Sequence, residues 1–420
     1  MNNKDLKNLN GAIHIFTSCT TCYIPKARVL AESVKKFHPS ITFHLVLSDK
    51  LPDFFDLQNE DFDSVILIEE LDIDNLEQWI FKHSVVEICT AVKPLAFCKI
   101  FSTYSNCQKI IFLDPDTAIF SSLDGLLDCL EDNSILLTPH QLEPEKTEEK
   151  IIDNELAILR HGIFNLGFIA VKASPEGHKF IDWWSDRCLN FCFIDPANGI
   201  YTDQRWIDLV PSYFPDFHII RDPGCNVANW NLSNRVLTGD INSKILVNQS
   251  PLVFYHFSSS QSIMSDKHDV INDTSALLLQ WYENKCMAMG NLKYATLDSF
   301  YNLFDNGEPI SNQARITYRY SRKLQKLFPN PYDTKIQKHS FFEWLHLNES
   351  IQRDINSLYL GDLEHINHHE KIFALSKNID LMKQEINGVT AEMTAMESSK
   401  FWKLRTIWFI VKGVFKGKWA

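Results

Sequence analysis

The order of short apolar runs along the chain limits the possible fold more than any other feature. Seven runs have the length and character of buried strands, and they cover residues 12–17, 42–47, 65–68, 109–113, 135–138, 168–171 and 252–255. Stretches with helical length or spacing separate many of them, at residues 26–37, 85–103, 122–130 and 176–192. This alternation predicts an α/β fold in which helices flank a mixed, mostly parallel sheet.

Two positions in these helices carry boundary signals. Ser122 stands where a serine would cap the helix at 122–130. Pro94 falls inside the helix at 85–103, where proline usually causes a kink or a break.

Two carboxylates follow one of the apolar runs directly, in the sequence KIIFLDPDTAIF at residues 109–120. In parallel α/β sheets, ligands bind beyond the carboxyl ends of the strands, which is where Asp114 and Asp116 are expected. Pro115 stiffens the backbone between them, and carboxylate oxygens are preferred ligands of Mg²⁺ and Mn²⁺. The pattern predicts a divalent metal site, although a plain turn or a helix N-cap has the same residues.

Composition excludes some classes of protein. The formal net charge of -12 disfavours a nucleic-acid partner, because such proteins usually present a basic face. The N-terminal residues do not have the pattern of a signal peptide, and no apolar run approaches the roughly 18 residues of a membrane span. The ten cysteines are therefore expected to be reduced thiols in a cytoplasmic protein.

The chain changes character after about residue 290. Apolar residues then follow a short heptad-like spacing at Leu375, Ile379, Met382, Ile386, Val389, Met393 and Met396. Such a helix can form a homo-oligomer, or it can pack on its own domain. Residues 398–420 interleave basic and aromatic side chains and contain no acid, which favours peripheral contact with an anionic membrane surface over a tail packed on the body.

Several segments together resemble a known family. The segment IIFLDPDTAIF is similar to the metal-binding motif of GT-A-fold glycosyltransferases, particularly those related to glycosyltransferase family eight, which include bacterial lipopolysaccharide sugar transferases and glycogenin. Other segments are similar to the family in the family's own order, namely AIHIFTSCTTCY, TAVKPLAFCKIF, GIFNLGFIAV, YTDQRWIDLVP, CNVANWNL and PLVFYHFSS. The resemblance covers roughly residues 12–260.

The resemblance implies roles for individual residues. The metal ligands would be Asp114, Asp116 and His256. The donor-binding residues would be Thr17, Tyr23, Lys93, Asp114, Asn165 and Gly167. The catalytic residues beside the reacting carbon would be Asp203 and Gln204. The acceptor-binding residues would be Asn226, Asn229 and Trp230.

Each of these side chains also has a simpler explanation. His256 could be a core histidine with one hydrogen bond, and Asp203 could cap the helix that follows it. Lys93 could be a surface lysine with a buried stem. Asn165 and Gly167 could form an ordinary turn.

The resemblance implies a metal-dependent glycosyltransferase with Mn²⁺ or Mg²⁺ as cofactor. It would move a sugar, with retention of configuration, from a nucleotide-diphosphate donor to a saccharide or lipid-linked cell-envelope acceptor at the inner face of the membrane. UDP-sugar is the favoured donor, although the aspartate that usually reads the base is absent after the first strand. Lys93 also replaces the usual arginine, which loses a bidentate contact.

Two other classes remain open, a metal-dependent nucleotidyl- or phosphotransferase and a catalytically degenerate carbohydrate-binding protein. The first usually has a glycine-rich phosphate loop, which this sequence lacks. For the glycosyltransferase we expect a catalytic domain at 1–265, a helical acceptor-side extension at 266–360, and the heptad helix with its basic tail at 361–420.

Overall fold

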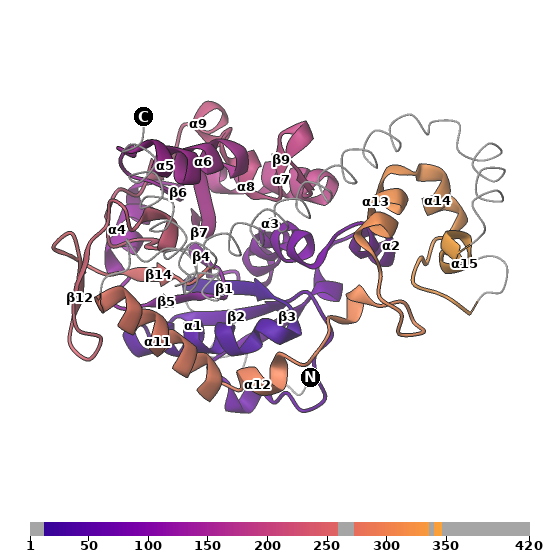
Figure 1. The fold of residues 1–420 in the computed structure, drawn as a ribbon, viewed down its shortest axis with the longest axis horizontal. Helices are drawn as coiled ribbons and strands as arrows, with labels where there is room; N and C mark the ends of the chain where they lie inside the picture. Colours follow the sequence, from indigo (N-terminus) through magenta and orange to yellow (C-terminus); the bar gives the residue numbers. More distant parts are fainter. Residues whose placement is uncertain (1–11, 259–272, 336–339, 347–420) are drawn as a thin grey trace, which may run out of the picture. The chain divides into compact units, whose positions relative to one another are not determined.

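The computed structural model describes residues 12–258, 273–335 and 340–346 (Figure 1). The chain divides into two compact units, one formed by Met1–Arg315 with Leu327–Leu345 and the other by Ile316–Lys326 with His346–Ala420. The large sheet and the candidate site described below belong to the first unit. The predicted heptad at 375–396 and the basic tail at 398–420 lie outside the described residues.

The first unit is built on a seven-stranded sheet in the order β10-β6-β7-β4-β1-β2-β3. Neighbours run parallel throughout, except that β7 is antiparallel to both β4 and β6. This confirms the predicted α/β class, a mixed and mostly parallel sheet flanked by helices. The strands are β1 (Ile13–Cys19), β2 (Thr42–Leu47), β3 (Ser64–Leu67), β4 (Lys109–Leu113), β6 (Ile135–Pro139), β7 (Phe164–Lys172) and β10 (Phe217–Ile219).

Smaller strands complete the unit. The pair β5 (Thr117–Ile119) and β14 (Phe254–His256) is antiparallel, and so is the pair β8 (Ile194–Asp195) and β9 (Ile200–Tyr201). A three-stranded sheet contains β11 (Leu237–Gly239), β12 (Ile245–Val247) and β13 (Ser250–Pro251).

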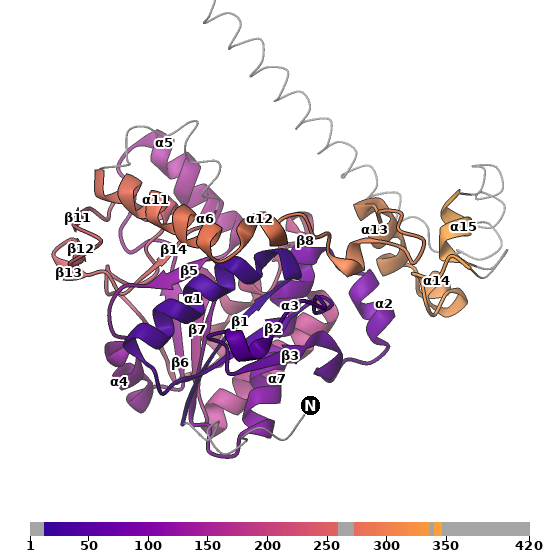
Figure 2. The ribbon, with the colours of Figure 1, turned by 90° about the horizontal axis from the view of Figure 1, so that it is seen from below.

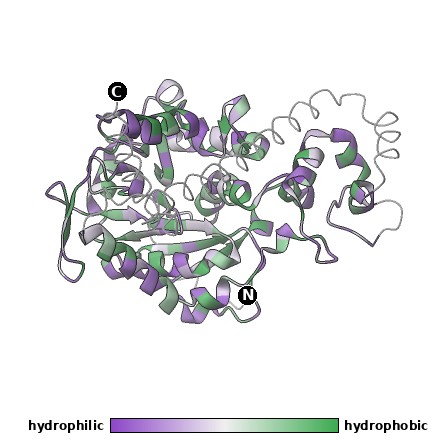
Figure 3. Ribbon diagram, viewed as in Figure 1, coloured by the Kyte–Doolittle hydropathy of each residue, from purple (hydrophilic) through white to green (hydrophobic). Residues whose placement is uncertain are grey.

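Helices cover both faces of the large sheet, and Figure 1 shows α3 above it and α1 below it. Successive residues of a strand point their side chains to opposite faces of the sheet. Phe112 packs in one core with residues of α3 (Val85–Thr103) and α7 (Pro175–Phe191), whereas Ile111 packs in another with α1 (Ile24–Phe37) and α4 (Asp124–Asp132). Colouring by hydropathy shows both kinds of residue along the helices, as expected for helices with one buried face (Figure 3).

Further helices are shorter, apart from α11 (Asp273–Ala288), which lies alongside α1 in both views (Figures 1 and 2). The others are α2 (Leu76–Phe81), α5 (Glu148–Lys150), α6 (Leu156–His161), α8 (Gln204–Ile207), α9 (Val210–Tyr213), α12 (Asn291–Tyr294), α13 (Asn312–Tyr320), α14 (Arg322–Leu327) and α15 (Phe341–His346). Within the described residues, no helix is both long and apolar enough to cross a bilayer.

The helix expected at 85–103 is confirmed, whereas the serine cap expected at Ser122 is wrong. Helix α4 begins at Asp124, with Leu123 at the capping position, and the backbone N–H of Leu123 donates to His38 at 2.8 Å instead. Helix α3 runs through Pro94 without a break, because its start is secured by a capping box of Ser84 with Glu87 and most of its middle is buried. All ten cysteines lie in the described residues and are free thiols, as expected.

A row of polar side chains crosses three parallel strands inside the sheet. The rings of His14 on β1 and His44 on β2 share a hydrogen bond of 2.7 Å, and His44 also bonds Ser64 on β3. Burial lowers the pKa of His44 to about 3, and the nearby positive charges of His14 and Lys35 act in the same direction. His44 is therefore neutral in the folded protein at neutral pH.

We expect the protein to lose stability as pH falls below about 6.5, because unfolded His44 takes up a proton there, whereas folded His44 does so only near pH 3. Between pH 7.5 and pH 5 the free energy of unfolding should fall by about 2 kcal/mol more in the wild type than in His44→Asn. Urea unfolding at the two pH values measures this. His218→Asn, at an exposed histidine, is the matched control, and equal losses in all three proteins would contradict the assignment.

Candidate metal and donor site

The two aspartates of the Asp-Pro-Asp segment form a turn between β4 and β5. The backbone N–H of Thr117 donates to the Asp114 carbonyl at 3.0 Å, which closes the turn. Strand β5 then pairs with β14 in a register that puts His256 opposite Thr117. Segments about 140 residues apart in sequence are thus joined by backbone hydrogen bonds, and this pairing carries His256 to the carboxylates.

The predicted metal ligands converge in space. His256 Nε2 lies 3.0 Å from Asp116 Oδ1 and 3.5 Å from Asp114 Oδ2. Ligand atoms of the three residues all lie within 4.8 Å of one another, and in the described part of the chain they form the one cluster of this kind. Burial lowers the pKa of His256, but the charges of Asp116 and Asp114 outweigh it and raise the pKa above its usual value. The three side chains are close enough to share one ion.

Asn165 lies behind the histidine on β7. Its Oδ1 lies 3.2 Å from His256 Nδ1 and accepts hydrogen bonds of 3.0 Å from the Gly167 N–H and from Asn226 Nδ2. A bond from Nδ1–H to this oxygen leaves His256 Nε2 free to face the carboxylates, as in many metal sites. Asn165 and Gly167 belong to a regular strand here, so the alternative of an ordinary turn does not apply.

Gly167 is required by this arrangement. A Cβ at this position would lie 2.5 Å from His256 Nδ1 and 2.7 Å from Asn165 Oδ1, which is closer than real atoms approach. The absence of a side chain therefore lets the imidazole lie against β7.

Lys93 is buried, with an exposed fraction of 3%, and is not a surface lysine. Its Nζ lies 3.4 Å from Asp114 Oδ1 and 3.2 Å from Asp203 Oδ2, and it donates to the Leu166 carbonyl at 2.9 Å. Lys93 thus links a candidate metal ligand to a candidate catalytic residue. The two carboxylates outweigh the effect of burial and raise the pKa of Lys93, so it stays charged.

Asp203 precedes α8, but its side chain makes no capping hydrogen bond. Burial raises the pKa of Asp203, while the charge of Lys93 opposes this. The neighbouring Gln204 uses both ends of its amide on the backbone: its Oε1 accepts from the Leu166 N–H at 3.0 Å, and its Nε2 donates to the His161 carbonyl at 3.1 Å. In this structure Gln204 braces β7 against α6.

The proposed acceptor residues lie on the β14 side of the metal cluster. The ring of Trp230 meets the ring of His256 edge to face, with centroids 5.3 Å apart. Asn229 is half-buried next to it, whereas Asn226 is buried and its amide nitrogen bonds Thr138 and Asn165. Of the predicted donor residues near β1, Thr17 is fully buried in the strand and Tyr23 is 41% exposed.

A cavity of about 610 Å³ opens beside Asp116. One wall comes from the start of α1, with Tyr23 and Lys26, and the other from α11 and α12, with Glu283 and Asn291 among its residues. The structure therefore joins the candidate metal cluster to a space that a small ligand can enter.

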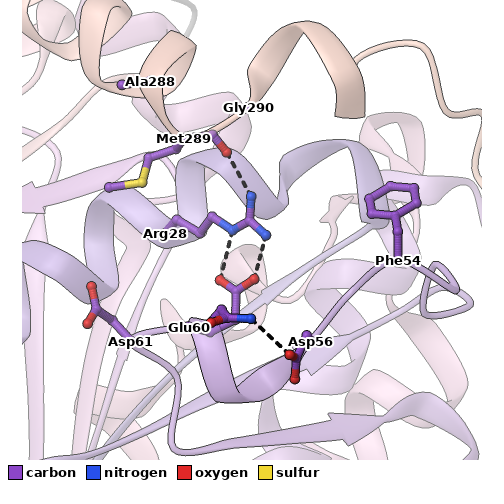
Figure 4. A pocket seen from close by; sticks show the side chains of 9 residues that line it. Arg28, Phe54, Asp56, Glu60, Asp61, Ala288, Met289 and Gly290 are labelled. Atoms are coloured by element: carbon purple, nitrogen blue, oxygen red, sulfur yellow. Dashed lines mark hydrogen bonds and ion pairs between the residues drawn. The ribbon is translucent and has the colours of Figure 1, made fainter.

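The wall formed by α11 and α12 is fastened by Arg28 of α1. Its guanidinium donates to the carboxylate of Glu60, to the Met289 carbonyl at 2.8 Å and to the Tyr294 hydroxyl at 3.0 Å. Figure 4 shows Arg28 pointing toward Glu60 and Met289 in a second pocket of about 390 Å³. Lys285 of α11 also pairs with Glu32 of α1 at 2.8 Å.

Sequence reasoning missed two residues of this region. Lys26 lines the cavity, but in the sequence it was only the first residue of the helical stretch at 26–37. His140 Nε2 lies 3.3 Å from Asn165 Nδ2, and burial lowers the pKa of His140 to about 4, so it is a neutral acceptor. His140 follows β6 directly, so the strand-end argument used for Asp114 would have found it.

We expect Gly167→Ala to weaken Mn²⁺ binding by about tenfold or more, because the new methyl group must displace the His256 ring. Isothermal titration calorimetry with Mn²⁺ measures the effect. Gly125→Ala is the control, since nothing lies within 4 Å of a Cβ there. Unchanged Mn²⁺ affinity in Gly167→Ala would show that His256 does not bind the ion.

Part of the chain is similar in sequence to known proteins. Residues 14–175 match the model of the family described as glycosyl transferase family 8. Two uncharacterized proteins of Bacillus subtilis (strain 168) are similar to this chain. YfnF is 27% identical over 189 residues, which make up 45% of this chain and 62% of YfnF. YfnD is 28% identical over 174 residues, which make up 41% of this chain and 53% of YfnD. The chain thus spans less than two thirds of the length of either relative.

Two solved glycosyltransferase structures have low similarity to this chain. The galactosyltransferase LgtC, crystallised with donor and acceptor sugar analogs, is 16% identical with a TM-score of 0.41, covering 66% of this chain and 96% of LgtC. The glycosyltransferase GlyE of Streptococcus pneumoniae TIGR4 is 13% identical with a TM-score of 0.37, covering 70% of this chain and 67% of GlyE. The residues that match the model of glycosyl transferase family 8, 14–175, contain Lys93, Asp114, Asp116, Asn165 and Gly167.

Proposed function

We propose that the protein is a metal-dependent glycosyltransferase that takes its sugar from a nucleotide-diphosphate donor. The observation that carries the proposal is the convergence of Asp114, Asp116 and His256 from two distant segments, with Asp116 lining a cavity. The relationship of residues 14–175 to glycosyl transferase family 8 supports it. In this proposal the donor is a UDP-sugar, and the acceptor is a saccharide or a lipid-linked saccharide of the cell envelope.

The cluster fits a divalent cation. Two carboxylates and one imidazole suit Mn²⁺ better than Mg²⁺, which prefers oxygen ligands. Asn165 and Gly167 support the fit, since one orients the imidazole and the other leaves room for it. When bound, the ion would act as a Lewis acid toward the leaving nucleotide diphosphate.

The residues of the chain have complementary tasks in this proposal. Tyr23 is exposed at the cavity and offers its ring for stacking on the base. Asp203 is held as a buried carboxylate by Lys93, next to Asp114, where it can face the sugar. Trp230 offers an aromatic surface to the acceptor beside His256. Transfer with retention is proposed from the family relationship, with Asp203 as an electrostatic partner of the reacting carbon.

The two alternatives give different products. A nucleotidyl- or phosphotransferase would break a bond within the diphosphate and release a nucleoside monophosphate or a phosphate. A carbohydrate-binding protein would release nothing. A glycosyltransferase slowly transfers the sugar to water and releases the intact nucleoside diphosphate.

We expect Mn²⁺-dependent release of nucleoside diphosphate from at least one of a panel of UDP-, GDP- and dTDP-sugars without acceptor. Asp116→Asn should reduce the rate at least 100-fold, because it removes a charged ligand on which the leaving group depends. Asp128→Asn, at an exposed aspartate of α4, should keep the wild-type rate. EDTA should stop release and Mn²⁺ should restore it. Absence of both release and binding across the panel would rule out the proposal.

The basic and aromatic residues at 398–420 are proposed to bring the enzyme to the inner membrane face, where lipid-linked acceptors are available. Deletion of 398–420 should move the protein from the membrane fraction to the supernatant after centrifugation of cell lysate. Replacing the basic residues of this segment by glutamine should have a smaller effect, because the aromatic residues remain. Unchanged partitioning of the deletion variant would remove this part of the proposal.

A further inference from the structure

Lys93, the residue expected to contact donor phosphate, is already neutralised. Asp114 and Asp203 both lie within ion-pair distance of its Nζ, and the Leu166 carbonyl takes a further hydrogen bond. Its exposed fraction is 3%. Withdrawing Lys93 toward a ligand would leave the carboxylate of Asp203 buried with only the Thr202 hydroxyl as partner and no positive charge beside it, which is costly.

Lys26 is differently placed. Of the described residues that line the 610 Å³ cavity, it is the one lysine or arginine. It is half-buried on the first turn of α1, and its Nζ lies 4.0 Å from the centre of the Tyr23 ring. Within the described part of the chain it forms no ion pair.

A negatively charged ligand at this site needs one more positive charge beside it, and Lys26 is in position to supply it. A divalent ion on Asp114 and Asp116 would be electrically balanced, and so is Lys93 with Asp203. Glu283, which is exposed on the opposite wall of the cavity, carries one more negative charge. A diphosphate that joins this set adds negative charge in a half-enclosed space, where an unbalanced charge is costly. The cation that lines the cavity beside Asp116 is therefore the natural partner of that charge.

We propose that Lys26 binds the diphosphate of the ligand in this cavity, in place of the contact expected from Lys93. The inference rests on the proposed function for its choice of nucleotide, but the predicted contact is to the diphosphate itself. The simpler explanation is that Lys26 is a helix lysine resting on an aromatic ring. Lys36 is such a lysine, because it lies on the same helix, is exposed, and has its Nζ 5.4 Å from the centre of the Phe37 ring.

The test is calorimetric binding of UDP, inorganic pyrophosphate and uridine to the full chain, each with and without Mn²⁺. Lys26→Met should weaken UDP and pyrophosphate binding about 10- to 100-fold, the loss expected for a hydrogen bond between charged groups. Uridine binding and the melting temperature should not change. Lys26→Arg should restore most of the affinity, and Lys36→Met should match the wild type. Lys93→Met should instead lower the melting temperature.

The outcomes show whether the role of Lys26, the proposed function or both are wrong. Wild-type affinity of Lys26→Met for UDP and pyrophosphate would overturn the role of Lys26 and leave the glycosyltransferase proposal in place. Equal loss of uridine binding would also overturn it, because Lys26 would then act through the Tyr23 ring. If pyrophosphate binds in a way that depends on Lys26 but UDP does not bind, the result would support the role of Lys26 and contradict a UDP-sugar as the donor. If the wild type binds neither, both fail.

Discussion

The antiparallel pairing of β14 with β5 is the contact on which the candidate site depends. It sets His256 opposite Thr117, one residue beyond the Asp-Pro-Asp turn, and so brings an imidazole to two carboxylates from a distant part of the chain. The remaining features accommodate this pairing. Gly167 leaves room for the ring, Asn165 orients it, and Asn226 holds the amide of Asn165. Backbone register, rather than side-chain attraction, thus decides which residues can meet at the cluster.

The second organising feature is the distribution of charge around Lys93. A single buried ammonium lies between Asp114, which faces the metal cluster, and Asp203, which belongs to the following helical segment. Removing Lys93 would leave the buried carboxylate of Asp203 without a counter-charge, so the three side chains are expected to act as one unit. A lysine is suited to this position, since its ammonium joins two carboxylates from inside the fold.

The large sheet and the metal cluster could be predicted from sequence because both follow from local patterns. The runs at 42–47 and 109–113 coincide with β2 and β4, and a polar residue after a buried strand is a direct sign of a ligand site. The bonds of Gln204 to the backbone could not be predicted, because they depend on how β7 and α6 approach each other. The burial of Lys93 was missed since lysine is usually exposed, and Lys26 was missed since its neighbours across the cavity come from α11 and α12.

The hydrogen bonds from Arg28 to the Met289 carbonyl and the Tyr294 hydroxyl form late in synthesis, because their partners are translated long after Arg28. The carboxylates, the imidazole and the strands that carry them are all translated before Glu283 and Asn291, which complete the cavity. Until Arg28 engages the Met289 carbonyl and Tyr294, the space beside Asp116 has one wall. In the proposed function, the residues that would hold the ion are thus synthesised before the residues that complete the nucleotide cavity.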